Sequence, residues 1–139
     1  MRILISACLL GKNCRYNGTN SASPRVRAFV EGHETVEICP ELLAGMPTPR
    51  PCAELAAGVV VDEQGRNVDE EYRRGARLAL EQAKKMGIDL AVLQPRSPTC
   101  GVNQVYDGSF TGRLVKGRGV FAQALLDAGY TVLDAEELP

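Results

Sequence analysis

Short apolar segments alternate with segments of helical spacing along this chain, and this alternation limits the folds that it can adopt. Residues 69–86 show the clearest helical pattern, with apolar side chains on one face and Gly87 after the end. Ser23 followed by Pro24 is typical of the start of another helix. Strands that alternate with helices form right-handed crossovers around a parallel sheet. The strands are expected at residues 2–7, 35–38, 90–93 and 130–133.

The length of 139 residues suits one domain. The pattern therefore predicts a single α/β, Rossmann-like domain over residues 1–139, with a mostly parallel sheet of about four strands and flanking helices. Residues 59–61 and 66–68 surround a turn sequence, which predicts a small hairpin. Asp69 is expected to cap the long helix that follows. Residues 39–57 are expected to be irregular, and a loop this long in a compact domain is often functional.

The charge balance and the cysteine count exclude several classes of protein. Lysine and arginine number 16 against 17 aspartates and glutamates, and the net charge of −1 gives no electrostatic footprint for duplex nucleic acid. No apolar run approaches the roughly 20 residues of a membrane span. The odd number of five cysteines argues against a secreted disulfide scaffold. We therefore expect a cytoplasmic protein without a membrane or duplex partner; the sequence predicts no oligomeric state.

Three of the cysteines each follow one of the expected strands. Cys8 comes after the first strand, Cys39 after the second and Cys100 after the third. Ligands of such sheets bind beyond the carboxyl ends of the strands, where all three cysteines would meet at one edge. Their positions therefore predict a shared site for metal binding or catalysis. Cys52 has no such placement and is interpreted as a small buried side chain.

Other interpretations of the cysteines stay open from the residues alone. The segment from Cys8 to Arg15 resembles the phosphate loop of low-molecular-weight tyrosine phosphatases. It has six intervening residues where that loop has five, however, and the chain lacks an Asp-Pro pair for a general acid. A structural zinc site usually carries close CxxC pairs, which are absent here. The plainest interpretation is that the cysteines are buried as small hydrophobic side chains.

Six ordered motifs resemble one family over essentially the whole chain. They lie at residues 6–11, 14–18, 39–41, 49–51, 97–101 and 106–112. On these motifs the chain is similar to the bacterial YbbK-like family, formerly a domain of unknown function, which contains the thiouracil desulfidase TudS. It departs from the family pattern at Asn17, Thr99 and Cys52, where aspartate, serine and proline are common. None of these positions is an expected ligand.

The resemblance implies a [4Fe-4S] cluster as cofactor, held by only three cysteines. By position these are Cys8, Cys39 and Cys100, and Cys14 is an alternative to Cys8 because it lies close by in the next motif. Thiolate ligands suit iron–sulfur chemistry. Three protein ligands on four irons leave one iron open, and an open metal site can act as a Lewis acid toward a substrate.

The resemblance also implies catalytic roles for Glu41 and Ser97. Glu41 corresponds to an acid that activates water or moves protons, and Ser97 to a residue that orients substrate or proton. From the residues alone, Glu41 is a helix-start or surface acid and Ser97 a loop cap beside Pro98. The implied reaction is hydrolytic, non-redox removal of sulfur from a small thiolated, nucleobase-like substrate of the thiouracil type. The alternatives are a non-catalytic or regulatory metal-binding module and a cysteine-nucleophile hydrolase of the phosphatase type.

Overall fold

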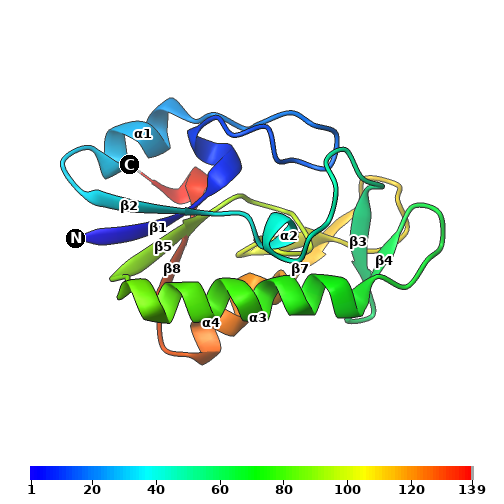
Figure 1. Cartoon of the computed structure of the whole chain (residues 1–139). Coiled ribbons are helices and arrows are strands. Elements are labelled where there is room, and N and C mark those ends of the chain that lie inside the picture. The colour runs from blue at the N-terminus through cyan, green and yellow to red at the C-terminus, as the bar shows by residue number, and fades with distance from the viewer. Residues whose placement is uncertain (139) are drawn as a thin grey trace.

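A four-stranded parallel sheet forms the centre of the protein, in a computed structural model that describes residues 1–138 (Figure 1). The strands, in spatial order, are β2 (Glu34–Ile38), β1 (Arg2–Ser6), β5 (Leu90–Leu93) and β8 (Thr131–Asp134). Leu4 of β1 is aligned with Val36 of β2 on one side and with Ala91 of β5 on the other. The predicted α/β fold with a parallel sheet of four strands is confirmed.

Helices cover both faces of this sheet. The long helix α3 (Asp69–Met86) and α4 (Val120–Asp127) pack against each other on one face. Helix α1 (Pro24–Val30) and the short 3₁₀ helix η1 (Ala7–Leu10) lie on the other face (Figure 1). No helix in the described part of the chain is both long and apolar enough to cross a membrane.

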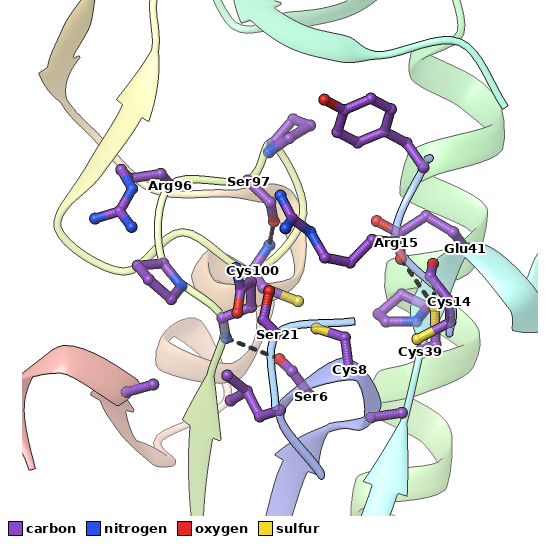
Figure 2. Close-up of a pocket in the computed structure, with 18 of the residues that line it drawn as sticks. Ser6, Cys8, Cys14, Arg15, Ser21, Cys39, Glu41, Arg96, Ser97 and Cys100 are labelled. Carbon is purple, nitrogen blue, oxygen red and sulfur yellow. Dashed lines mark hydrogen bonds between the residues drawn. The ribbon is translucent and has the colours of Figure 1, made fainter. Parts of the chain in front are cut away.

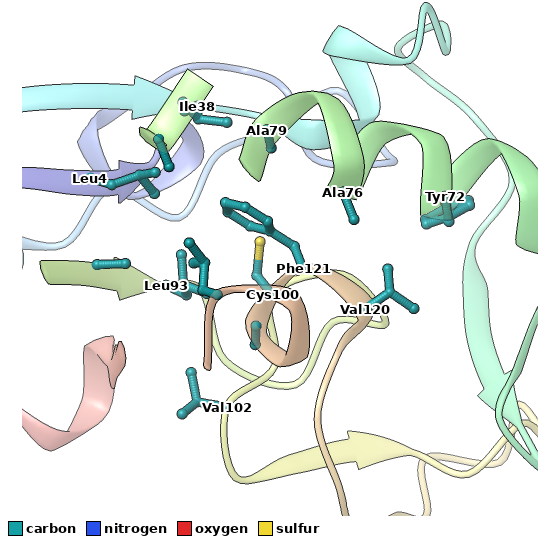
Figure 3. Close-up of a cluster of buried hydrophobic side chains, with 14 of the residues drawn as sticks. Leu4, Ile38, Tyr72, Ala76, Ala79, Leu93, Cys100, Val102, Val120 and Phe121 are labelled. Atoms are coloured by element: carbon teal, nitrogen blue, oxygen red, sulfur yellow. The ribbon is translucent and has the colours of Figure 1, made fainter. Parts of the chain in front are cut away.

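Side chains of β1 point alternately into two buried clusters, one on each face. Leu4 belongs to the cluster that contains Ala79 of α3 and Phe121 of α4 (Figure 3). Ile3 and Ile5 belong to the cluster on the α1 side. The continuous apolar sequence of this strand therefore reflects burial on both faces, as expected for a parallel sheet covered by helices.

The predicted hairpin is present, and its first strand also pairs with a segment that was not predicted as a strand. Strand β4 (Val59–Asp62) pairs antiparallel with β3 (Ala53–Ala56). The two strands are joined by Ala57 and Gly58, whose φ values of 50° and 84° are those of a two-residue hairpin turn. Residues 66–68 also pair with β4, because Val61 and Asn67 form an antiparallel bridge. The N–H of Asp62 donates to the carbonyl of Arg66 at 2.9 Å and the N–H of Val68 to that of Val60 at 3.0 Å. The predicted pairing is therefore present, and β3 is an additional partner that was not predicted.

The chain after β4 turns back because of the Asp62 side chain. Its carboxylate accepts hydrogen bonds from the N–H groups of Gln64 at 2.9 Å and Arg66 at 3.0 Å. These bonds close the turn of the predicted hairpin, and the antiparallel bridge between Val61 and Asn67 follows it. A side chain that bonds to nearby backbone thus stabilises the turn between the two paired segments.

Of the two helix caps predicted from the sequence, one is present and the other is not. The Ser23 hydroxyl accepts a 3.2 Å hydrogen bond from the N–H of Val26 and caps α1, as predicted. The prediction that Asp69 caps α3 is wrong, because Val68 occupies the capping position. The Asp69 carboxylate instead accepts a hydrogen bond from the N–H of Val60 at 3.0 Å and ties α3 to β4.

Several short elements were not predicted. Helix α2 (Pro40–Leu43) follows Cys39 directly, so residues 39–57, predicted to be irregular, contain both this helix and β3. Strand β6 (Gln104–Tyr106) pairs antiparallel with β7 (Leu114–Lys116). The described chain ends in the 3₁₀ helix η2 (Ala135–Glu137).

Candidate functional site

A cavity of about 660 Å³ lies at the carboxyl ends of β1, β2 and β5 (Figure 2). Cys8, Cys39 and Cys100 all line it, so the structure brings together the three cysteines that follow the strands. Glu41 and Ser97 line the same cavity. The five residues singled out from the sequence therefore share one site, while their individual roles stay predictions.

The backbone that follows each strand places its cysteine. Cys8 is the second residue of η1, which begins directly after β1. Cys39 lies between the last residue of β2 and the first residue of α2, and Cys100 lies in the loop after β5. Cys8 and Cys100 are only 7% and 6% exposed, whereas Cys39 is half-buried. Figure 2 shows the three side chains directed toward a common space.

The loop that contains Cys100 is stabilised by its own hydrogen bonds. The Ser97 hydroxyl oxygen accepts from the N–H of Cys100 at 2.7 Å and from the N–H of Thr99 at 3.3 Å. The carbonyl of Ser97 accepts from the N–H of Gly101 at 3.0 Å. Ser97 therefore caps this loop, which is the simpler of the two roles considered for it. These bonds use only the oxygen of the hydroxyl, so its proton is available to another partner.

Cys14 contributes a fourth thiol to the cavity. It is 3% exposed, and its side chain forms hydrogen bonds with those of Cys8 and Cys39. Arg50 fixes this part of the chain by donating from Nη2 to the Cys14 carbonyl at 2.9 Å. Because Cys8 and Cys14 lie together against Cys39, both stay candidates for the first ligand position.

Burial and hydrogen bonding raise the pKa of the Cys14, Cys39 and Cys100 thiols in the metal-free protein. The hydrogen bond with Cys39 lowers the pKa of Cys14, but the bond with Cys8 and burial raise it, and the pKa reaches about 11. The hydrogen bond with Cys14 and burial raise the pKa of Cys39. Burial, followed by the charge of Glu41, raises the pKa of Cys100. Because thiols bind metal as thiolates, any metal bound by these thiols would displace their protons.

Glu41 reaches the cavity from the first turn of α2. Its Oε1 accepts a 2.6 Å hydrogen bond from the Thr99 hydroxyl. Its Oε2 accepts from the thiol of Cys39 at 3.3 Å (Figure 2). One carboxylate oxygen is therefore bonded to residues 97–101, the cysteine loop that contains Cys100. The other oxygen lies against the thiol of Cys39, where it can take or give a proton.

Several residues that line the cavity were not predicted from the sequence. Cys52, interpreted as a buried side chain without a role, is half-buried in the cavity wall. Arg15 also lines the cavity, and its place beside Cys14 in a motif was the available signal. Tyr72 lies there too, although its position in the apolar stripe of α3 suggested only packing. Its burial raises the pKa of the phenol to about 12.

The backbone after Cys8 does not form a phosphate-binding loop. The N–H groups of Gly11, Lys12 and Arg15 donate to backbone carbonyls at 3.1 to 3.3 Å. A phosphate loop instead directs free N–H groups at its ligand. This geometry counts against the phosphatase interpretation.

The donor set suits an iron–sulfur cluster better than a single ion. Within residues 1–138, no three His, Cys, Asp or Glu side chains are placed to hold one metal ion. In a cluster each thiolate binds its own iron, so the ligands need not surround one point. The five cysteines are all free thiols. All five line one cavity together with a carboxylate, which fits the chemistry of a thiolate-bound cluster.

These features define an α/β protein with a thiol-lined cavity and a carboxylate at the carboxyl edge of its parallel sheet. The chain belongs to the 2-thiouracil desulfurase family, whose profile matches residues 3–137. The family resemblance inferred from the motifs is confirmed.

Two relatives extend this likeness over almost the whole chain. The uncharacterized protein YbbK of Bacillus subtilis (strain 168) is 40% identical over 146 residues, which cover 98% of this chain and 97% of YbbK. The solved structure of the [4Fe-4S]-dependent thiouracil desulfidase TudS matches with a TM-score of 0.92 and 38% identity. That match covers 99% of this chain and 93% of the TudS chain.

Proposed function

We propose that this protein is an iron–sulfur-dependent desulfidase that removes sulfur from a small thiolated molecule of the nucleobase type, with thiouracil as the representative substrate. The observation that supports this most is the presence of Cys8, Cys39, Cys100 and Glu41 in one cavity. Membership of the 2-thiouracil desulfurase family and the likeness to TudS add to it. The cavity of about 660 Å³ lies within the range of small-molecule sites.

Cys8, Cys39 and Cys100 would hold a [4Fe-4S] cluster, with Cys14 as the alternative to Cys8. When bound, a cluster with one iron free of protein ligands supplies a soft Lewis acid for the sulfur of the substrate. The thiols lose their protons on binding, which removes the thiol donor beside Glu41. Such thiolate chemistry requires a reducing compartment, and we assign the protein to the cytoplasm.

The reaction that we assign is hydrolysis of a thiocarbonyl group. Water adds its oxygen to the carbon and the sulfur leaves as hydrogen sulfide, so that C=S and H₂O give C=O and H₂S with no change in net oxidation state. Water must lose its protons and sulfur must gain them. Glu41 is assigned these transfers because its Oε2 lies at the thiol-lined part of the cavity. Ser97 is assigned the orientation of the substrate through its hydroxyl proton.

The test is turnover by protein reconstituted with iron and sulfide under anaerobic conditions. We expect a broad visible absorption band, and we expect thiouracil to give uracil and sulfide in equal amounts, with the iron-free protein inactive. Iron-loaded protein that turns over neither thiouracil nor its nucleoside and nucleotide forms would contradict the proposal. That result would favour a non-catalytic or regulatory metal-binding module.

The variant Glu41→Gln tests the assigned proton transfer within the same assay. Glutamine keeps the size of the side chain but cannot exchange a proton, so turnover should fall by about 10²–10⁴-fold. Iron and sulfide must be quantified for each protein, because an empty site would mimic a catalytic defect. Wild-type turnover by iron-loaded Glu41→Gln would remove Glu41 from the proposal.

A further inference from the structure

The carboxylate of Glu41 has a fully buried hydroxyl partner in Thr99. Thr99 Oγ1 donates to Glu41 Oε1 at 2.6 Å and joins α2 to the loop after β5. Thr99 has an exposed fraction of 0%, so water does not compete for its single hydroxyl proton. Hydrogen bonds to an ionised acceptor are about twice as strong as those between neutral groups. This contact therefore fixes one oxygen of the carboxylate.

The backbone that presents this hydroxyl is itself held in place by the start of α4. The carbonyl of Thr99 accepts from the N–H groups of Phe121 at 2.9 Å and Ala122 at 3.2 Å, and its N–H donates to the Ser97 hydroxyl. Gly119 lies so close that a Cβ there would be 2.4 Å from the carbonyl carbon and oxygen of Thr99. The hydroxyl therefore has little freedom to move relative to α4.

The other hydrogen bond to Glu41 depends on a proton that ligation removes. Glu41 Oε2 accepts from the thiol of Cys39 at 3.3 Å. A cysteine that binds iron does so as a thiolate and has no proton to donate. In the described part of the chain, the Thr99 hydroxyl is then the side-chain donor that still bonds to Glu41. Oε1 is held, and Oε2 is left free beside the thiols.

We propose that Thr99 is a positioning residue of the desulfidase, whose hydroxyl holds Oε1 of Glu41 so that Oε2 faces the substrate and exchanges protons there. The proposal rests on the proposed function, because it takes the role of Glu41 from it. The role requires a hydroxyl at position 99 rather than threonine itself. Serine should therefore serve, and valine, which replaces the hydroxyl by a methyl group, should not.

The first test compares Thr99→Val with Thr99→Ser in iron-loaded protein, after iron, sulfide and the thermal midpoint have been measured. We expect kcat of Thr99→Val to fall by about tenfold, the factor for loss of a hydrogen bond to a charged group, with little change in KM. Thr99→Ser should retain wild-type turnover, and both variants should bind as much iron as the wild type. A serine variant as slow as the valine variant would overturn the proposal.

The second test asks whether Thr99 acts through Glu41. When Thr99→Val is added to Glu41→Gln, we expect no further loss of kcat, because the two residues act as one unit. A further tenfold loss in the double variant would overturn the proposal. If Thr99→Val does not load with iron, Thr99→Ala replaces it. Failure of both to load, while Thr99→Ser loads, would also overturn the proposal and assign the hydroxyl to holding the cysteine loop.

A structural measurement separates this proposal from the function on which it rests. In crystal structures of the iron-loaded proteins, we expect one position of the Glu41 carboxylate in the wild type and in Thr99→Ser, and a displaced or divided position in Thr99→Val. An unmoved carboxylate in Thr99→Val would overturn the proposal whatever the substrate is. Failure of the proposed function would be seen separately, as an inactive iron-loaded wild type or a fully active Glu41→Gln.

Discussion

Several thiols in the cavity have a higher pKa than free cysteine because they are buried against one another. The clearest case is Cys14, whose pKa of about 11 results from opposing hydrogen bonds with Cys39 and Cys8 and from burial. In the unfolded chain this thiol returns to its ordinary value of 9.0. The folded, iron-free protein therefore keeps a proton that the unfolded chain loses between these two values.

This difference predicts that the iron-free protein becomes easier to unfold as the pH rises from 9.0 toward 11. Below pH 9.0 both states hold the proton, and the contribution of Cys14 to the free energy of unfolding is fully present; above it the unfolded chain binds fewer protons, so this free energy decreases. Urea unfolding at a series of pH values measures the effect. Other groups titrate in the same range, so the control is Cys14→Ala, which should show a weaker pH dependence. An identical dependence in both proteins would contradict the prediction.

The sequence predicted some of these residues and not their contacts. Cys8, Cys39 and Cys100 could be found because each follows a recognisable strand and parallel strands end at one edge. The bond between Thr99 and Glu41 joins residues 58 apart in the chain, and neither periodicity nor spacing indicates it. It depends on how α2 and the cysteine loop are packed, which only the folded chain determines.

At the scale of elements, the start of α4 supports the loop that contains Cys100. The N–H of Val120 donates to the carbonyl of Pro98 at 2.8 Å, and the N–H of Gly119 donates to that of Gly101 at the same distance. Position 119 must be glycine for this approach, because a Cβ would be 2.4 Å from the carbonyl atoms of Thr99. The packing of one helix end thus fixes the position of a candidate ligand.

Gly119→Ala is therefore expected to move the cysteine loop away from α4. The overpacking should lower the free energy of unfolding by about 1–3 kcal/mol and reduce the iron retained per chain. The matched control is Gly117→Ala, whose added Cβ would meet only the Val105 side chain, at 3.2 Å. Thermal unfolding and iron analysis of both variants measure the difference. Equal stability and equal iron content in the two variants would show that the close approach has no such role.

The elements themselves were predicted to different degrees for physical reasons. The two central strands, β1 and β5, are apolar runs buried on both faces, which makes them visible in the sequence. The edge strands β2 and β8 are more exposed and are indicated by shorter apolar patterns. Strands β6 and β7 have three residues each, too few to show a period. The turn sequence indicated the pairing of β4 with residues 66–68, whereas its pairing with β3 was missed because residues 39–57 were expected to be irregular.

At the scale of the whole molecule, the cavity joins the two apolar clusters of the sheet. Cys100 belongs to the cluster covered by α3 and α4, whereas Cys8 and Cys14 belong to the one covered by α1. Cys39 packs against the second cluster from the edge strand β2. The thiols therefore meet only when β2, β1 and β5 are assembled, and binding of a cluster should stabilise the folded chain as a unit.

The central claim is that Cys8, Cys39 and Cys100 hold an iron–sulfur cluster in this cavity. The most direct measurement is the iron and sulfide content, with the visible spectrum, of single serine variants of the five cysteines after anaerobic reconstitution. We expect Cys8→Ser, Cys39→Ser and Cys100→Ser to lose the cluster, and Cys14→Ser and Cys52→Ser to keep it. Retention of a full cluster by Cys39→Ser or Cys100→Ser, or loss in Cys14→Ser with retention in Cys8→Ser, would contradict this ligand set.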